Sequence, residues 1–206
     1  MNKKSLIALD VDGVLLDYST AYAKAWEKAF GHHPVEVNPH AFWPHERWGI
    51  PWLEGEQLKH FKAQFDEVFW STLPALPGAV EACAQLIDAG FELIAVTAID
   101  SDWLDARILN LQSRGFPIER VVATGGALPG RPNPKAAFVN ELMPMAFVDD
   151  YPPFLEGIHE SVYLALIQHT QMGDKRGTKG LERTSTYASL HAFSSAWVNR
   201  RRPPNK

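Results

Sequence analysis

The sequence has little of three things that would place it in a special class of protein. Cys83 is the only cysteine among 206 residues, so no disulfide can form within the chain, and a reducing compartment is favoured. Basic residues are not in excess: 20 lysines and arginines against 24 acidic residues give a formal net charge of -4, which argues against nucleic-acid binding. No run approaches the roughly 18 apolar residues that a membrane-spanning helix needs. Carboxylates interrupt the N-terminal stretch where a signal peptide would be apolar, so we expect a soluble, cytoplasmic protein that binds neither membrane nor nucleic acid.

What the sequence does contain is the ordinary composition of a globular protein, with 46% apolar and 21% charged residues. Five short apolar runs predict buried strands: 6–9, 91–98, 120–124, 145–150 and 162–168. Most of these runs are continuous rather than alternating, which is typical of parallel strands covered on both faces. Helical patterns lie between and after them: 77–90, 101–115, 133–142 and 189–202. This alternation predicts an α/β fold with a doubly wound parallel sheet.

Two of the predicted helices contain residues that bear on packing. In the helix at 101–115, Leu104, Ile108 and Leu111 are spaced to form one buried stripe. Cys83 lies within the helix at 77–90 beside other apolar positions, so we interpret it as a small core residue rather than a nucleophile. Residues 170–184 predict only a polar loop before the last helix.

Residues 18–72 do not follow the alternation of strands and helices. They hold 12 of the 23 aromatic residues and 5 of the 8 histidines but no convincing buried strand. Helical patterns at 19–30 and 55–70 flank a loop rich in proline, histidine and tryptophan, and the histidine spacing fits no standard zinc site. We therefore predict a small helical domain at 18–72, inserted into a core domain formed by residues 1–17 and 73–206.

Polar side chains follow the predicted strands at the points where the strands end. Asp10 and Asp12 come directly after the first strand, and Thr97 lies near the end of the second. Asp149 and Asp150 close the fourth strand. Because ligands of open α/β sheets bind at the carboxyl ends of the strands, we expect these side chains to converge on one edge.

Each of these residues alone also has a purely structural interpretation. A single aspartate can accept backbone hydrogen bonds at a strand end, and the Thr97 hydroxyl can bond its own backbone. Asp10 and Asp12 together are harder to explain, because like charges so close raise each other's pKa unless a cation intervenes. The second acidic pair repeats the pattern without a local basic cluster, and such a set of hard oxygen ligands favours Mg2+.

Lys135 is predicted in the first turn of the helix that leads into the fourth strand, after Asn133 as a possible cap and Pro134. A lone lysine is most often a solvated surface residue. A cation near the free N–H groups of a helix start is electrostatically unfavourable, so its position there is better explained if an anion also binds.

The order DxDG (10–13), a strand ending in Thr97, a helix-borne Lys135 and a DD pair closing an apolar strand resembles the haloacid dehalogenase-like superfamily of hydrolases. The resemblance spans roughly residues 5–155, and the four motifs are specific together although weak singly. It implies a Rossmann-like core with a helical cap inserted after the first motif.

The resemblance also implies a role for each motif residue. Asp10 would be the nucleophile that forms an aspartyl-phosphate, and Asp12 would transfer protons. Thr97 and Lys135 would hold the phosphoryl oxygens. The metal ligands would be Asp10, the Asp12 backbone carbonyl and Asp149, with Asp150 in support. Many relatives read K-P-x-P in the third motif, whereas this chain reads RPNPK, so Arg131 is an alternative to Lys135.

An acid at position 12 suits a phosphate ester, whose leaving alkoxide needs a proton, and disfavours a dehalogenase. The sequence therefore predicts a Mg2+-dependent phosphatase that acts on a small phosphorylated metabolite. A phosphotransferase or mutase using the same intermediate is the alternative. A receiver-like domain is disfavoured by the large insertion after the first strand, and a non-catalytic scaffold by the competent side chain at every expected position.

The loop at 40–52 predicts where a substrate's leaving group would be recognised. Trp43, Trp48 or Trp52 could stack on a ring, and Arg47 or His45 could meet an anion. The alternative is that the tryptophans fill a small core of their own. Asp17, just before the inserted segment, is interpreted as a charge at a helix N-terminus rather than as part of a hinge.

Overall fold

One parallel sheet organises the chain, as a computed structural model of residues 5–127, 131–168 and 181–201 shows. Its six strands follow the order β3-β2-β1-β4-β5-β6. Their bounds are β1 (Ser5–Leu9), β2 (Phe91–Thr97), β3 (Arg120–Ala123), β4 (Ala146–Asp149), β5 (Tyr163–Ile167) and β6 (Thr184–Tyr187). The first five agree with the apolar runs within one residue at each end. The sequence did not predict β6, because its short polar segment TSTY forms no apolar run.

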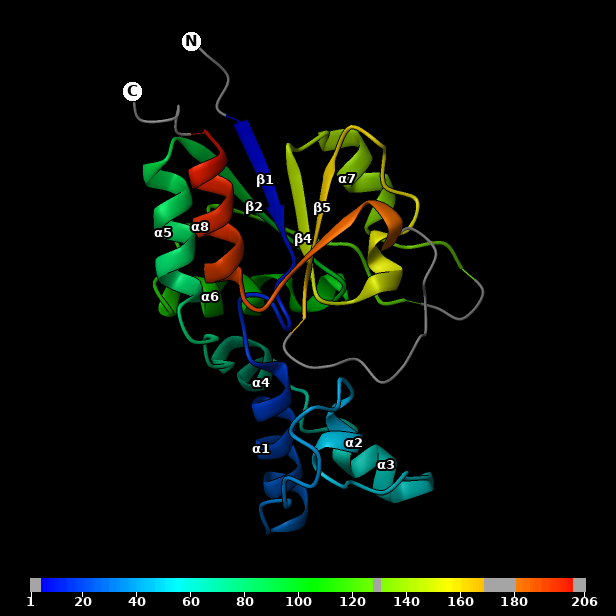
Figure 1. The fold of residues 1–206 in the computed structure, drawn as a ribbon. Coiled ribbons are helices and arrows are strands. Elements are labelled where there is room, and N and C mark those ends of the chain that lie inside the picture. Colours follow the sequence, from blue (N-terminus) through cyan, green and yellow to red (C-terminus); the bar gives the residue numbers. More distant parts are fainter. Residues whose placement is uncertain (1–4, 128–130, 169–180, 202–206) are drawn as a thin grey trace.

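Helices cover both faces of this sheet (Figure 1). The α-helices after the inserted segment are α5 (Ala79–Asp88), α6 (Leu104–Ser113), α7 (Ala136–Leu142) and α8 (Leu190–Arg201). Short 3-10 turns are η1 (Ser101–Trp103), η2 (Pro152–Leu155) and η3 (Leu181–Arg183). Figure 1 shows α5, α6 and α8 on one side of the sheet and α7 on the other. The predicted α/β, Rossmann-like doubly wound sheet is confirmed.

Successive residues of β1 face two separate hydrophobic cores. Ile7 and Leu9 pack in the larger core with residues of α5 and α8, whereas Ala8 packs in the smaller core with Val139 of α7. β1 lies between β2 and β4 in the middle of the sheet, so it is covered on both faces. Val11 continues into the larger core, fully buried, and the polar residues on either side of it therefore lie at the end of the central strand.

Residues 18–72 form helices that lie together at the end of the molecule toward which β1 points (Figure 1). The helices are α1 (Tyr18–Phe30), α2 (Pro44–Arg47), α3 (Gly55–Lys62) and α4 (Glu67–Thr72). The stretch predicted as one helical pattern at 55–70 is thus divided between α3 and α4. The division occurs because Asp66 caps a new helix, its side chain accepting a hydrogen bond from the Phe69 backbone N–H at 2.9 Å.

Two linkers join this inserted segment to the sheet and run side by side. The backbone N–H of Leu76 donates to the Leu15 carbonyl at 2.9 Å, and that of Asp17 donates to the Pro74 carbonyl at 2.8 Å. The Asp17 side chain accepts hydrogen bonds from the backbone and hydroxyl of Thr20, so it caps the start of α1 as the sequence predicted. Entry to and exit from the segment are therefore held next to the end of β1.

The buried face of α6 differs from the predicted stripe. Leu111 is buried as expected, but Leu104 and Ile108 are only half-buried. The fully buried positions include the polar residues Arg107 and Asn110, because this helix packs against the polar backbone of the exit linker as well as against apolar side chains. Cys83 in α5 is completely buried, as predicted.

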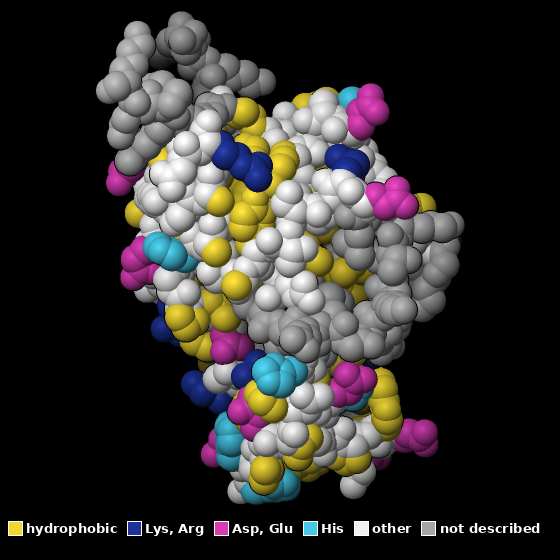
Figure 2. Space-filling model, in the orientation of Figure 1, with side chains coloured by type: hydrophobic (Ala, Val, Ile, Leu, Met, Phe, Trp, Pro, Cys, Tyr) yellow, Lys and Arg dark blue, Asp and Glu magenta, His cyan; other side chains and the backbone are white. Residues whose placement is uncertain are grey.

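No helix among the described residues is long and apolar enough to cross a membrane. Of the loop predicted at 170–184, residues 170–180 lie outside the described part of the chain, and its last residues form η3 and the start of β6. The histidines of the inserted segment lie at the surface, where Figure 2 shows them over the lower end of the molecule.

Candidate active site

A buried lysine joins two carboxylates at the ends of neighbouring strands. Asp10 follows β1 and Asp149 closes β4, and the strands are held in register there by a 2.8 Å hydrogen bond from the Asp10 N–H to the Val148 carbonyl. The Lys135 ammonium Nζ donates to Asp10 Oδ1 and to Asp149 Oδ2, both at 2.6 Å. All three side chains are almost completely buried, so these charges are strongly coupled.

A turn before α7 brings Lys135 to this position. The Asn133 side chain accepts a hydrogen bond from the Lys135 N–H at 2.9 Å and donates to the carbonyls of Phe154 and Glu156 at 2.6 and 3.0 Å. The sequence predicted Lys135 within the first turn of this helix. The structure places it one residue earlier, at the N-cap of α7. Arg131, the alternative cation, is exposed, lies at the rim of the site and makes no ion pair with the strand-end acids.

The surroundings keep Lys135 charged. Burial alone would lower the pKa of its ammonium, but the adjacent carboxylates of Asp10 and Asp149 reverse this effect and raise the pKa above its usual value. The Phe154 ring also lies 4.3 Å from Nζ, measured to the ring centroid, and contributes a cation–π contact. Lys135 therefore stands as a fixed positive charge beside Asp10.

Asp12 has a different cationic partner, which the sequence did not predict. Arg107 of α6 places its Nη2 2.9 Å from Asp12 Oδ1 and donates a 2.9 Å hydrogen bond to Oδ2. Burial raises the pKa of Asp12, the Arg107 guanidinium opposes that rise, and the Asp10 charge adds to it, with a net upward shift. The two acids of the DxD motif thus have separate cations, Lys135 for Asp10 and Arg107 for Asp12.

Asp150 packs directly against the glycine of the DxDG motif. Gly13 has φ 88°, a left-handed conformation that favours glycine. A Cβ atom at this position would lie 1.9 Å from Asp150 Oδ2, so the close approach of the two residues also requires glycine. The pKa of Asp150 is raised well above its usual value by burial and by the neighbouring charges of Asp10 and Asp149.

The acids outnumber the cations in a way that suits a divalent metal ion. Four carboxylates, those of the DxD and DD motifs, face two cations, so two negative charges remain uncompensated when all the acids are ionised. Burial and the Asp10 charge raise the pKa of Asp149 to about 7. Oxygen atoms of Asp10, Asp149 and Asp150 lie within 4.8 Å of one another, and carboxylate oxygens are the ligands Mg2+ prefers. These residues fit a divalent cation.

Compared with the predicted ligand set, the structure brings the side chain of Asp150 into this carboxylate group and leaves that of Asp12 outside it. The Asp12 side chain is turned toward Arg107 instead. The expectation that Asp12 contributes its backbone carbonyl therefore stays a prediction.

Thr97 closes β2 and is almost completely buried. Its Oγ1 has no hydrogen-bond partner among the described residues. A buried hydroxyl without a partner is costly, so a ligand that offers an oxygen to it would recover that free energy. The family resemblance implies that Thr97 binds a phosphoryl oxygen, which would be such a ligand.

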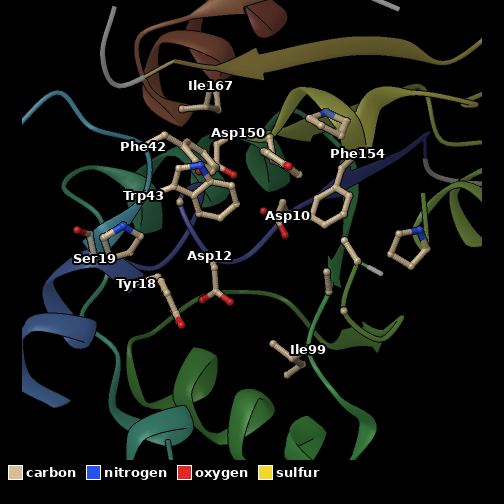
Figure 3. Close-up of a pocket in the computed structure, with 18 of the residues that line it drawn as sticks. Asp10, Asp12, Tyr18, Ser19, Phe42, Trp43, Ile99, Asp150, Phe154 and Ile167 are labelled. Carbon is tan, nitrogen blue, oxygen red and sulfur yellow. The ribbon is translucent and has the colours of Figure 1, made fainter. Parts of the chain in front are cut away.

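A cavity of about 1250 Å³ opens over Asp10, Asp12 and Asp150, with Thr97, Lys135 and Asp149 beneath its lining, and residues of the inserted segment bound it on one side. Figure 3 shows the Asp10, Asp12 and Asp150 carboxylates facing this cavity together with the Trp43 and Phe154 rings. The aromatic wall is continuous: the Phe42 ring stacks on that of Tyr151 at 5.3 Å and 18°, and Tyr151 contacts Phe154 at 5.1 Å. The cavity is far larger than a phosphate group needs, so it has room for an organic leaving group.

Only some of the residues predicted to recognise the leaving group line the cavity. Trp43 and Arg47 line the cavity, whereas Trp48 and Trp52 do not. Trp48 packs within the inserted segment and donates its Nε1–H to the Ser19 carbonyl at 2.9 Å, and Trp52 is 84% exposed beside His45. Among the loop tryptophans, Trp43 therefore has the position suited to contact a ligand.

Sequence reasoning missed three residues that line or support the site: Arg107, Phe42 and Tyr151. A signal for Arg107 was present, because it lies four positions before Leu111 on what becomes the buried side of α6. Phe42 and Tyr151 come from distant parts of the chain, and no local pattern indicates that their rings would stack.

Comparison with known proteins agrees with this geometry. Residues 4–143 match the family model described as haloacid dehalogenase-like hydrolase. The chain belongs to this family. It is therefore a hydrolase by family, and the matched residues contain three of the four motifs described above: DxDG, Thr97 and Lys135.

Solved structures of the family share the fold at low sequence identity. The L-2-haloacid dehalogenase from Xanthobacter autotrophicus with chloropropionic acid covalently bound superposes with a TM-score of 0.62 at 15% identity, covering 98% of this chain and 100% of that one. A HAD family hydrolase from Deinococcus radiodurans with bound phosphate and sodium gives a TM-score of 0.60 at 17% identity, covering 96% of each chain.

A relative from Bordetella pertussis, named "Putative 5'(3')-deoxyribonucleotidase", is 37% identical over 93 residues. That match covers 43% of this chain and 46% of the relative, so this chain spans just under half the length of the curated relative it matches.

Proposed function

We propose that this protein is a Mg2+-dependent phosphatase that hydrolyses a small phosphate monoester through an aspartyl-phosphate on Asp10. The observation that carries the proposal is the pairing of Asp10 with Lys135 at the edge of a cavity that Asp12 also lines. A carboxylate nucleophile, a fixed cation and a second acid are the groups that a two-step displacement at phosphorus requires.

The first step is the transfer of the phosphoryl group to the protein. A carboxylate oxygen of Asp10 forms a bond to phosphorus while the bond from phosphorus to the leaving oxygen breaks, and Asp12 gives its proton to that oxygen. The Lys135 ammonium offsets the repulsion between Asp10 and the anionic substrate. The Thr97 hydroxyl, buried without a partner among the described residues, donates to a phosphoryl oxygen.

The second step releases inorganic phosphate. A water molecule forms a bond to phosphorus, its proton passes to Asp12, and the bond to Asp10 breaks. Both residues then return to their starting states, so one ester and one water give one alcohol and one phosphate.

Asp10, Asp149 and Asp150 would hold the Mg2+ ion, which when bound supplies positive charge that lowers the cost of negative charge on the phosphoryl oxygens. The excess of two negative charges in the site supports a divalent rather than a monovalent ion. Asp150 would also keep the Gly13 loop in contact with the metal ligands.

We further propose that residues 18–72 act as a cap domain that selects the leaving group. Phe42, Trp43 and Tyr151 form a half-buried aromatic wall that an aromatic ring in the leaving group would stack on, and Arg47 lies at the same cavity. Together with the name of the Bordetella relative, this wall favours nucleoside monophosphates as the substrate class. Arg47 also pairs with Glu36 at 2.7 Å, so its charge is partly engaged within the cap.

The test of the reaction is a phosphatase assay with a generic aryl phosphate, in Mg2+ and in EDTA. Asp10→Asn should abolish turnover with the fold retained, since an amide cannot act as the nucleophile. Asp88→Asn makes the same chemical change on the exposed side of α5 and should leave the rate unchanged. Retained turnover in Asp10→Asn would refute the assignment of the nucleophile.

A substrate panel tests the leaving group. Nucleoside monophosphates, sugar phosphates and small phosphorylated acids are compared in wild type, Trp43→Ala and Trp52→Ala. Loss of the aromatic wall in Trp43→Ala should reduce kcat/KM selectively for nucleotides, whereas the exposed Trp52 serves as the matched control. Unchanged relative rates in Trp43→Ala would show that the aromatic wall does not select the substrate.

Transfer of phosphate to an added alcohol or sugar phosphate in preference to water would instead indicate the phosphotransferase alternative.

A further inference from the structure

Arg107 is a completely buried cation to which the proposed reaction gives no task. It lies in α6, does not line the cavity, and contacts only one of the motif carboxylates, that of Asp12. We propose that Arg107 is a positioning residue that holds the Asp12 carboxylate in the orientation for proton transfer to the leaving group. This inference rests on the proposed phosphatase function.

The contact is made from the protein side and leaves the cavity side open. Arg107 Nη2 donates a 2.9 Å hydrogen bond to Asp12 Oδ2 and lies 2.9 Å from Oδ1, which is buried with no hydrogen-bond partner among the described residues, so Arg107 holds the carboxylate through Oδ2. The Arg107 side chain is 0% exposed, whereas that of Asp12 is 24% exposed and lines the cavity (Figure 3). A leaving-group oxygen can therefore approach Asp12 while Arg107 fixes the carboxylate from behind.

The guanidinium is itself held in place. Its Cζ lies 5.2 Å from the centroid of the Trp70 ring, at the end of the inserted segment. On the same face of α6, Asn110 donates to the Leu73 carbonyl at 3.0 Å and Arg114 donates to the same carbonyl at 2.9 Å. The helix is thus anchored to the exit linker, and Arg107 projects from an immobilised surface toward Asp12.

Stability does not account for an arginine at this position. Arg107 Nε and Nη1 are buried with no hydrogen-bond partner among the described residues. Buried donors without partners and buried ions lower stability, and well-packed apolar side chains in their place are often neutral or stabilising. A residue that is unfavourable for the fold and contacts a carboxylate of the active site is better explained by that contact.

The inference predicts a dependence on the leaving group. Proton donation matters most when the leaving alkoxide is strongly basic, as with alkyl phosphates, and least for p-nitrophenyl phosphate, whose phenolate leaves without help. General acid catalysis contributes about 10²–10⁴-fold. We therefore expect Arg107→Met to lower kcat/KM by about 10²-fold for an alkyl phosphate and by less than about tenfold for p-nitrophenyl phosphate.

Two comparisons separate positioning from a general loss of structure. Arg183→Met removes an arginine of η3 that donates to the Val162 and Ile158 carbonyls, away from α6 and Asp12, so its effect should be equal for both substrates. In an Asp12→Asn background, Arg107→Met should cause little further loss with either substrate, because the residue through which it acts is already gone. Arg107→Gln, which is too short to reach Asp12 but stays polar, replaces Arg107→Met if that variant does not fold by circular dichroism.

The outcomes are distinguishable. A leaving-group-selective loss that disappears in the Asp12→Asn background supports the inference. An equal loss for both substrates, or the same loss in the Asp12→Asn background, overturns it while the phosphatase proposal stands. Wild-type protein that hydrolyses neither substrate with Mg2+ refutes the proposed function and this inference with it.

Discussion

Lys135 illustrates how single residues decide the properties of this site. Its ammonium lies between two carboxylates that are themselves almost free of solvent, so each charge depends on the others. The residues of this group follow from the sequence because the chemistry sits at predictable strand ends. The partner of Asp12 does not follow from it, since Arg107 is one arginine within an amphipathic pattern and its contact spans 95 positions along the chain.

Removal of the buried cation should cost stability as well as activity. Lys135→Met leaves Asp10 and Asp149 facing each other without compensation, and breaking a buried pair in this way costs about 3–5 kcal/mol. Urea unfolding at neutral pH measures the loss. In this variant the two carboxylates repel each other and protonation relieves the repulsion, so the missing stability should return as the pH falls. Lys59→Met, at an exposed position of α3, should change the unfolding free energy by less than about 0.5 kcal/mol. A loss that does not depend on pH would contradict this account.

Gly13 tests the packing of the DD pair against the DxDG loop. Gly13→Ala forces a side chain onto a left-handed backbone and against Asp150 Oδ2. Gly31→Ala forces the same type of backbone at φ 77°, but nothing lies within 4 Å of its Cβ. Gly31→Ala should lose roughly 1–2 kcal/mol of stability, and Gly13→Ala should lose more, because the clash with Asp150 adds to the backbone strain. Only Gly13→Ala should also need more Mg2+ for half-maximal activity, by about 10-fold or more, because loss of a contact that supports a metal ligand typically weakens metal binding by that factor. Equal Mg2+ requirements in the two variants would show that Asp150 does not support the metal site.

At the scale of elements, continuous apolar runs predicted β1 to β5, including β3, which is a half-buried edge strand. β6, the other edge strand, escaped prediction because its four residues, TSTY, form no apolar run. The division between α3 and α4 was missed because the aromatic stripe continues across it: Phe65 contacts both Phe61 and Phe69, at 5.2 and 4.6 Å. Periodicity detects such a stripe, whereas the break depends on the capping side chain of Asp66.

The packing of α5 against the sheet and α8 predicts an unreactive thiol. Cys83 is completely buried between these elements, and burial raises the pKa of its thiol to about 12, so it stays protonated at neutral pH. A disulfide reagent such as dithionitrobenzoate should modify the native protein far more slowly than the urea-unfolded chain. In the unfolded chain one thiol per chain should react. Rapid modification of the native protein would show that α5 separates readily from the sheet.

At the scale of the whole molecule, the inserted segment begins where β1 ends, so topology alone directs it toward the strand ends that carry the acids. That much was open to sequence reasoning. The pairing of Phe42 with Tyr151 across the cavity was not, because it depends on how the segment docks on the sheet. The site is therefore shared between two parts of the chain, because residues of both line its cavity.

The burial of the acids at the strand ends should couple the stability of the whole protein to Mg2+ and to pH. The folded-state pKa of Asp149, about 7, lies above its ordinary value, so protonation of this group favours the folded metal-free protein. That contribution is complete below the unfolded pKa and is lost as the pH rises through about 7. A metal ion binds the ionised form, so the rise in Tm caused by Mg2+ should be small near about pH 5.5 and larger near about pH 8.

Thermal unfolding in EDTA and in excess Mg2+ at the two pH values measures the difference. Asp149→Asn should abolish most of the Mg2+-dependent rise, and an equal rise at both pH values in the wild type would mean that Asp149 is not the titrating ligand.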